Sequence, residues 1–228
     1  LFLPVAHVLA RLVMHLLLSG AGVLGFSPNI KNLLPDIQAF KPSVLLVVPR
    51  VLEKVYNAAS SKAGGGFKGR MFAWSAKQAR TYSIAQQRTF GPSLLKKVRH
   101  GVADALVLKK IRSVLGPNLR YIVSGGAPLA TDLAQFYSGM GITLLQGYGL
   151  SETTGPIAVQ HIGNNPIGAV GLPLPGNFIK IAKDGEILVR GQAVMPGYYH
   201  LPEETRAVMP DGTWFHTGDI GTISKSGQ

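Results

Sequence analysis

Three short segments combine glycine with hydroxyl and carboxylate side chains, a composition that could bind a ligand carrying phosphates. They are residues 124–129 (SGGAPL), 146–155 (QGYGLSETTG) and 214–219 (WFHTGD). Glycine lets a ligand approach the backbone closely, a hydroxyl can donate to a phosphate, and a carboxylate can hold Mg²⁺ together with phosphate oxygens. Each segment alone could also be an ordinary strand-to-helix turn or a capped loop. Their order along the chain is the stronger signal.

Several other kinds of catalytic site are excluded. The chain has no cysteine, which rules out disulfides, thiolate metal sites and a cysteine nucleophile. No segment has the GxSxG form of a serine elbow. The basic segment 62–70 (KAGGGFKGR) lacks the GK[ST] ending of a P-loop, so we interpret it as a flexible loop.

The first part of the chain alternates helix and strand signals. Leu9, Leu12 and Leu16 recur at helical spacing before a stop at Ser19 and Gly20. Residues 43–48 (SVLLVV) predict a strand buried on both faces of a parallel sheet, followed by a helix. A long helical region is expected after residue 70, ending before Gly116 and Pro117.

The later strands lead directly into the glycine-rich segments. Residues 119–123 predict a strand that enters SGGAP, a helix starts near Thr131, and residues 142–145 predict a strand that enters QGYG. Both motifs are therefore expected as loops at the carboxyl ends of strands, where α/β sheets bind ligands. This alternation predicts a layered α/β subdomain with a largely parallel sheet over residues 1–155.

The sequence pattern changes beyond about Pro156, where short segments of alternating apolar and polar residues are separated by glycine and proline. Residues 178–183 and 186–190 flank Asp184-Gly185, a dipeptide suited to the positive backbone dihedrals of a tight hairpin. Residues 156–228 are therefore expected to form a β-rich subdomain, the start of a small β-barrel-like unit.

Composition limits the partners. With 228 residues, 46% of them hydrophobic, the chain can bury a substantial core. The formal charge of +12 could serve nucleic acid, an anionic membrane or a polyphosphate substrate. Its basic groups lack the aromatic interleaving of a nucleic-acid platform, so no nucleic-acid partner is expected. The apolar stretch 12–26 is too short to span a bilayer. We expect a cytoplasmic protein; a peripheral membrane contact and plain solvated lysines both fit the charge.

The three ordered motifs resemble those of the adenylate-forming enzymes, which include acyl-CoA synthetases, firefly-type luciferases and peptide-synthetase adenylation domains. The opening segment 3–11 (LPVAHVLAR) and the wording QGYGLSETTG are most similar to long-chain fatty acyl-CoA synthetases, over essentially the whole chain. The resemblance implies ATP-dependent activation of a long-chain fatty acid to an acyl-adenylate and then to acyl-CoA. ATP, Mg²⁺ and coenzyme A are the cofactor and co-substrates that it implies.

The resemblance also implies roles for individual residues. Tyr148 would stack on adenine, and Asp219 would accept hydrogen bonds from the ribose hydroxyls. Ser151, where most of the superfamily has threonine, would donate to a phosphate. Glu152 would hold Mg²⁺, with a helix-start carboxylate favoured by the dipole as the alternative. The other residues expected around the nucleotide are Gly126, Ala127, Pro128, Gln146, Gly147 and Gly149.

Two residues near the start are candidates for the acyl substrate. His7 matches a histidine that lines the acyl and phosphate region in the family, and a core histidine is an equal interpretation. Arg11 stands where some bacterial members carry a tryptophan that gates the acyl tunnel, so the gate chemistry differs here. Gly139 and Gly141 could border a tunnel or pack in a core. Trp214 and His216 are expected to shape their loop.

Family elements at both ends are expected to lie outside the sequence: a phosphate-gripping loop before Leu1, and a C-terminal domain with a catalytic lysine after Gln228. We therefore expect an internal fragment of the large domain that is inactive alone. Two alternatives stay open, a fatty acyl-AMP ligase that loads a carrier protein and a non-catalytic adenylate-binding module. An amino-acid adenylation domain is disfavoured, because such sites usually need an acidic partner for the substrate amine.

Overall fold

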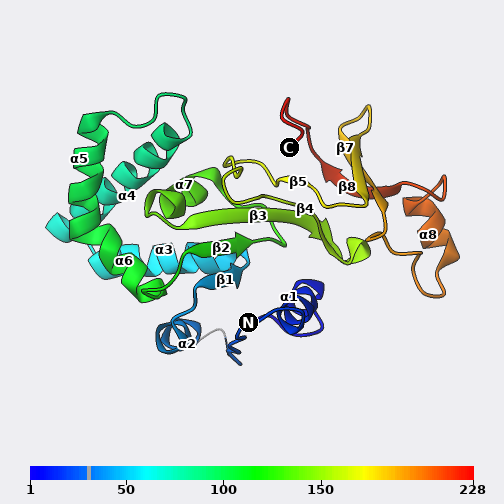
Figure 1. The fold of residues 1–228 in the computed structure, drawn as a ribbon, viewed down its shortest axis with the longest axis horizontal. Helices are drawn as coiled ribbons and strands as arrows, with labels where there is room; N and C mark the ends of the chain where they lie inside the picture. Colours follow the sequence, from blue (N-terminus) through cyan, green and yellow to red (C-terminus); the bar gives the residue numbers. More distant parts are fainter. Residues whose placement is uncertain (30–31) are drawn as a thin grey trace.

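A computed structural model describes residues 1–29 and 32–228, which form two sheets and their covering helices (Figure 1). The larger sheet has the order β1-β2-β3-β4-β5, with β1 to β3 parallel and β3 to β5 antiparallel. The predicted α/β class is confirmed. The strands are β1 (Val44–Val47), β2 (Tyr121–Ser124), β3 (Thr143–Leu150), β4 (Gly155–Val159) and β5 (Leu172–Pro173).

Residues of α3, α4, α6 and α7 pack with β1, β2 and β3 in one core. Helices α4 and α7 pack closely, because Gly139 has no side chain: a Cβ there would lie 2.0 Å from the backbone oxygen of Ala79. Gly139 is therefore a packing residue. The helical elements before β2 are α1 (Val8–Leu18), α2 (Leu33–Phe40), α3 (Pro49–Ala63), α4 (Gly66–Gln86), α5 (Leu94–Ala103), the π-helical turn η1 (Asp104–Leu108) and α6 (Lys109–Leu115). Those after β2 are α7 (Thr131–Gly139), the 3₁₀ turn η2 (Ser151–Thr153) and α8 (Pro202–Val208).

The second sheet is antiparallel, with the order β6-β7-β8. Its strands are β6 (Asn177–Ile181), β7 (Glu186–Gly191) and β8 (Phe215–Ile220). The predicted β6-β7 hairpin is present, but only Gly185 of the Asp184-Gly185 pair has a positive φ, of 92°. A turn over residues 182–185, closed by a 3.0 Å bond from the Gly185 N–H to the Ala182 carbonyl, makes the reversal.

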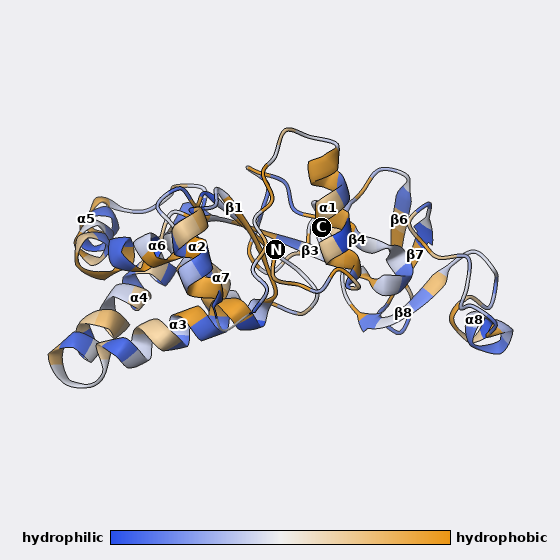
Figure 2. Cartoon of the chain, turned by 90° about the horizontal axis from the view of Figure 1, so that it is seen from below, coloured by the Kyte–Doolittle hydropathy of each residue, from blue (hydrophilic) through white to orange (hydrophobic). Residues whose placement is uncertain are grey.

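The faces of the larger sheet differ in what covers them. Leu45 and Val47 of β1 point into the main core with α3, α4 and α7, whereas Val44 is 54% exposed and Leu46 is half-buried on the other face. The prediction that β1 is buried on both faces is therefore wrong. The apolar helix α1 lies over this open face and contacts β4 (Figure 2). Within the described residues, no helix is long and apolar enough to cross a membrane.

Two local predictions are wrong, the loops expected at residues 62–70 and at QGYG. Only Gly64 and Gly65 separate α3 from α4, so most of the predicted loop at 62–70 is helical. Helix α4 carries a buried stripe of small residues against α7, including Ser75, Ala76 and Ala79. The QGYG segment is also no loop, because β3 continues to Leu150 and pairs with β4.

A small second core joins the two sheets. Ile157 of β4 packs with Val189 of β7 and Phe215 of β8, and Tyr148 and Leu150 of β3 lie against this cluster. Strands β4 and β5 stay on the larger sheet, so the change of sheet falls between Pro173 and Asn177. The division into parts at 155/156 stays a prediction, since strand pairing alone does not define a domain.

Candidate nucleotide and acyl site

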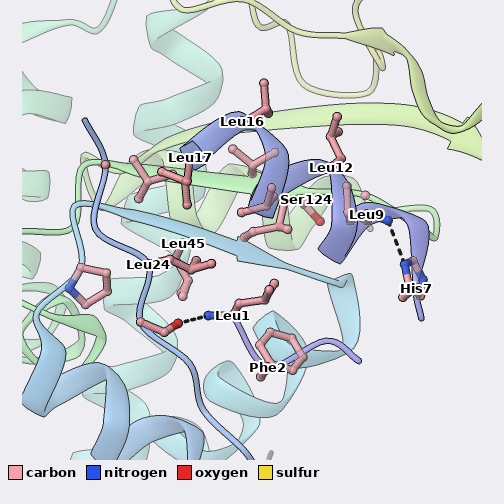
Figure 3. Close-up of a pocket in the computed structure, with 18 of the residues that line it drawn as sticks. Leu1, Phe2, His7, Leu9, Leu12, Leu16, Leu17, Leu24, Leu45 and Ser124 are labelled. Atoms are coloured by element: carbon pink, nitrogen blue, oxygen red, sulfur yellow. Dashed lines mark hydrogen bonds between the residues drawn. The ribbon is translucent and has the colours of Figure 1, made fainter. Parts of the chain in front are cut away.

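An apolar cavity of about 600 Å³ lies between α1 and the open face of the larger sheet. Leu9, Leu12 and Leu17 of α1 and Leu24 of the following segment line it (Figure 3). Its sheet side includes Val123 at the end of β2 and the glycines of the two expected motifs. Those glycines are Gly125, Gly126, Gly147 and Gly149.

The glycine at Gly149 is required by the pairing of two strands. A Cβ at Gly149 would lie 2.0 Å from the Gly155 oxygen and 2.6 Å from the Pro156 Cα, where the β3-β4 register shifts. A Cβ at Gly147 would lie 3.4 Å from its nearest atom, the Ala158 oxygen. Gly126 has a φ of 80°, a conformation that side chains disfavour. The cavity wall is therefore bare backbone at three of the predicted ligand-binding positions.

Tyr148 and Asp219 meet at the junction of the two sheets. The Tyr148 hydroxyl donates to Asp219 Oδ2 at 2.7 Å, although the residues are 71 positions apart. Burial raises the pKa of Tyr148, and the hydrogen bond to Asp219 acts in the same direction, so the phenol stays protonated at neutral pH. Asp219 itself is exposed. The pair thus offers an aromatic ring beside an accessible carboxyl group.

A bulge in β8 places Asp219. Glu186 pairs with Ile220 and Leu188 with His216, so β8 has two extra residues between these pairs, and Gly218 has a φ of 73°. Glu186 Oε1 accepts from the Gly218 N–H at 2.9 Å, and its Oε2 lies 2.7 Å from His216 Nδ1. The bulge turns Asp219 out of the ladder toward Tyr148.

Ser151 and Glu152 occupy the 3₁₀ turn η2 directly after β3. Ser151 is exposed, and Glu152 Oε1 accepts from the Tyr198 hydroxyl at 3.0 Å beside a smaller cavity shared with Glu186 and His216. Within residues 1–29 and 32–228, no group of three or more His, Cys, Asp or Glu side chains is placed to hold a metal ion. One half-buried carboxylate fits Mg²⁺ that arrives with phosphate oxygens, since that ion needs only one or two protein carboxylates.

The other predicted residues vary in their relation to the cavity. His7 lines it and caps α1, where its Nδ1 accepts from the Leu9 N–H at 3.2 Å. Arg11 is exposed, donates to the Val5 carbonyl and is not among the lining residues. Gln146 is buried within β3. Ala127 and Pro128 are exposed, and neither cavity includes Ala127, Tyr148 or Asp219.

Sequence reasoning missed Glu186 and Tyr198. Each contacts a predicted site residue or its turn, through Gly218 and Glu152 respectively. A usable signal existed for Glu186, because a glycine inside the strand-like segment before Asp219 indicates a bulge, whose unpaired N–H needs an acceptor. For Tyr198 no signal was present, since it lies 46 residues from Glu152.

The family model of the AMP-binding enzymes matches residues 1–199, and the chain belongs to this family. It is similar to the long-chain-fatty-acid–CoA ligase FadD15 of Mycobacterium bovis, with 48% identity over 99% of this chain and 37% of that protein. It is also similar to long-chain-fatty-acid–CoA ligase 5 of Mus musculus, with 33% identity over 96% of this chain and 33% of that protein. The chain therefore spans about a third of the length of these relatives.

The fold matches that of a solved structure, the inhibitor-bound N-terminal domain of FACL13 from Mycobacterium tuberculosis. The TM-score is 0.63 with 20% sequence identity, over 100% of this chain and 48% of that one. At this level of identity, the likeness supports the fold alone.

Proposed function

We propose that this chain is the nucleotide- and acyl-binding part of an AMP-forming long-chain fatty acid–CoA ligase. The observation that carries the proposal is the apolar cavity of about 600 Å³ whose wall contains the glycines of both motifs. An acyl chain needs such a cavity, and Tyr148, which donates to Asp219 of β8, lies on β3 between two of these glycines, Gly147 and Gly149. The two named relatives are fatty acid–CoA ligases, which is the activity proposed here.

The reaction that we propose has two steps. A carboxylate oxygen of the fatty acid attacks the α-phosphorus of ATP, and the bond to pyrophosphate breaks. The sulfur of coenzyme A then attacks the acyl carbonyl, loses its proton, and AMP leaves. The protein contributes positioning and charge stabilisation, because neither step needs a nucleophilic side chain.

Each proposed contact follows from a residue type and its place. Tyr148 would stack on adenine, Asp219 would accept from the ribose hydroxyls, and Ser151 would donate to a phosphate. Mg²⁺ would neutralise charge that develops on the phosphates, and Glu152 would hold it. Only Oε1 of Glu152 accepts the 3.0 Å hydrogen bond from Tyr198, so the carboxylate keeps lone pairs on its other oxygen for the ion.

Part of the predicted nucleotide site has no geometric support of this kind. Only the resemblance to the family supports the proposed contacts of adenosine with Ala127, Pro128 and Gln146. The same is true of the proposed substrate role of Arg11. His7 has the added support of lining the cavity. Contact with a membrane surface remains a proposal that rests only on the charge of +12.

Chain-length selectivity tests the acyl assignment. In the full-length protein, Leu12→Trp fills the cavity from α1, whereas Leu18→Trp makes the same change on the same helix at a position that is 82% exposed and does not line the cavity. Pyrophosphate release should be measured with ATP and fatty acids of increasing length. We expect Leu12→Trp to raise KM about tenfold more for a 16-carbon acid than for a 6-carbon acid, because each buried methylene contributes about 0.8 kcal/mol. Equal effects on both acids, or no pyrophosphate release from the wild type with any fatty acid, would refute the assignment.

A further inference from the structure

The bulge before Asp219 is held from the neighbouring strand by one side chain. Glu186, the first residue of β7, has only 18% of its side chain exposed, and both of its carboxylate oxygens have hydrogen-bond partners in β8. Oε1 accepts from the Gly218 N–H at 2.9 Å, and Oε2 lies 2.7 Å from His216 Nδ1. The carboxylate therefore bonds on both sides of Thr217.

Two further contacts tie the same turn. The Thr217 hydroxyl donates to the Ile187 carbonyl of β7 at 2.7 Å and accepts from the Asp219 N–H at 3.1 Å. The two extra residues of β8 thus have defined partners, although they are outside the ladder. Gly218, with its φ of 73°, is the point where the chain could most easily relax if the Glu186 bond were absent.

Asp219 depends on this turn because little else holds it. Its carboxylate is exposed and receives one side-chain hydrogen bond within the described residues, from Tyr148. A ribose diol is recognised only when the acceptor lies within a few tenths of an ångström of the right place. The turn, and with it Glu186, therefore sets where the acceptor stands relative to the Tyr148 ring.

We infer that Glu186 is a positioning residue that aligns Asp219 for a nucleotide ribose through the His216–Gly218 turn. The inference rests on the proposed function, since it assumes that Asp219 binds the ribose hydroxyls. Glu186 itself does not contact the nucleotide. Glu186 affects the selectivity for the ribose hydroxyls, in addition to any effect that it has on folding.

The test compares AMP with 2′,3′-dideoxy-AMP, which lacks both hydroxyls. Calorimetry on the full-length protein should give the ratio of the two dissociation constants for wild type, Asp219→Ala, Glu186→Ala and the double variant. We expect Asp219→Ala and Glu186→Ala each to lower the preference for AMP about tenfold, the range of a hydrogen bond to a charged group. The double variant should be no worse than Asp219→Ala, because both changes remove the same contact.

Two controls separate positioning from general damage. Glu53→Ala removes an exposed carboxylate on α3 and should leave the ratio unchanged. Glu186→Gln keeps an acceptor for Gly218 and should lower the preference less than Glu186→Ala; it also serves as the deciding variant if Glu186→Ala does not fold. A lower melting temperature with an unchanged ratio in Glu186→Ala, or in Glu186→Gln where only that variant folds, means a purely structural role and overturns the inference.

The outcomes also distinguish the ribose contact of Asp219 from the positioning role of Glu186. If Asp219→Ala lowers the preference and neither Glu186 variant does, the ribose contact stands and the positioning role is wrong. Additive losses in the double variant likewise overturn the positioning role. If Asp219→Ala leaves the ratio unchanged, the proposed ribose contact fails, and the role of Glu186 fails with it.

Discussion

At the scale of single residues, the hydroxyl group of Tyr148 links the two sheets through one hydrogen bond. Its ring packs against the second core while its hydroxyl donates to Asp219 at 2.7 Å. Tyr148→Phe keeps the ring and removes the donor, so we expect AMP to bind roughly threefold to tenfold more weakly, the range of one hydrogen bond. Tyr148→Ala should cost more, because the stacking surface is lost as well. Calorimetry with AMP checks both, and equal losses in the two variants would contradict a role for the ring.

At the scale of strands, the β3-β4 pair depends on one glycine. We expect Gly149→Ala to lower the free energy of unfolding by about 2 kcal/mol, because the added methyl meets backbone atoms that cannot move without breaking the pairing. Gly147→Ala adds the same methyl two residues earlier, where the nearest atom is 3.4 Å away, and should cost less than about 0.5 kcal/mol. Denaturant unfolding measures the difference, and similar values for the two variants would contradict it.

An ion pair joins the π-helical turn η1 to α6 and makes their stability depend on pH. Arg112 donates to both oxygens of Asp104 and, at 2.8 Å, to the Met140 carbonyl. The hydrogen bond from Arg112 lowers the pKa of Asp104 below its ordinary value of 3.8. A lowered pKa in the folded state means that the contribution is complete above that ordinary value and is lost as the pH falls through the folded pKa.

Asp104→Asn tests this linkage. We expect the variant to be less stable than the wild type by roughly 1 kcal/mol near neutral pH, a modest amount because the pair is partly exposed. The difference should shrink toward zero in acid, as Asp104 becomes protonated in the wild type. Melting temperatures of the two proteins from pH 7 down to pH 2.5 provide the measurement. A difference that is independent of pH would rule out the ion pair as its cause.

The elements that sequence predicted well are those whose local pattern and packing agree. Helix α1 and the β6-β7 hairpin follow from apolar spacing and turn residues, and strand β1 is present at its predicted place although one of its faces is open. The loop predictions for 62–70 and QGYG are wrong because glycine favours loops locally, whereas the conformation of each segment is set by its continuation into a helix or a strand. For QGYG the deciding partner is β4, whereas the exposed start of α4 continues a helix whose later turns, from Phe72 on, are buried.

In the candidate site too, local motifs predict the residues, whereas contacts distant in the chain determine their arrangement. Tyr148 and Asp219 were each singled out from their motifs, and the contact between them required the second sheet to fold against the first. The Glu186 bonds and the bulge at Gly218 depend on the register of β7 and β8, which the hydrophobic pattern alone does not specify. Motifs can therefore identify the residues of a site before the register that orients them is known.

At the scale of the whole molecule, packing in the second core fixes the position of one sheet relative to the other. Val189 of β7 is fully buried between Ile157 and Phe215, so it helps to set the distance between Tyr148 and Asp219. Val189→Ala should lower the free energy of unfolding by about 1–3 kcal/mol through the cavity that it leaves. Because the sheets can then shift relative to each other, AMP should also bind several-fold more weakly.

Val47→Ala is the matched control for this coupling. Val47 is also fully buried, and the same two methyl groups are removed, but in the main core among the helices. We expect a similar loss of stability with unchanged affinity for AMP. Since a bound ligand stabilises the folded protein by an amount that grows with its concentration over Kd, saturating AMP should raise the melting temperature less in Val189→Ala than in Val47→Ala. Equal shifts in the two variants would mean that the second core holds the sheets together without influencing the nucleotide site.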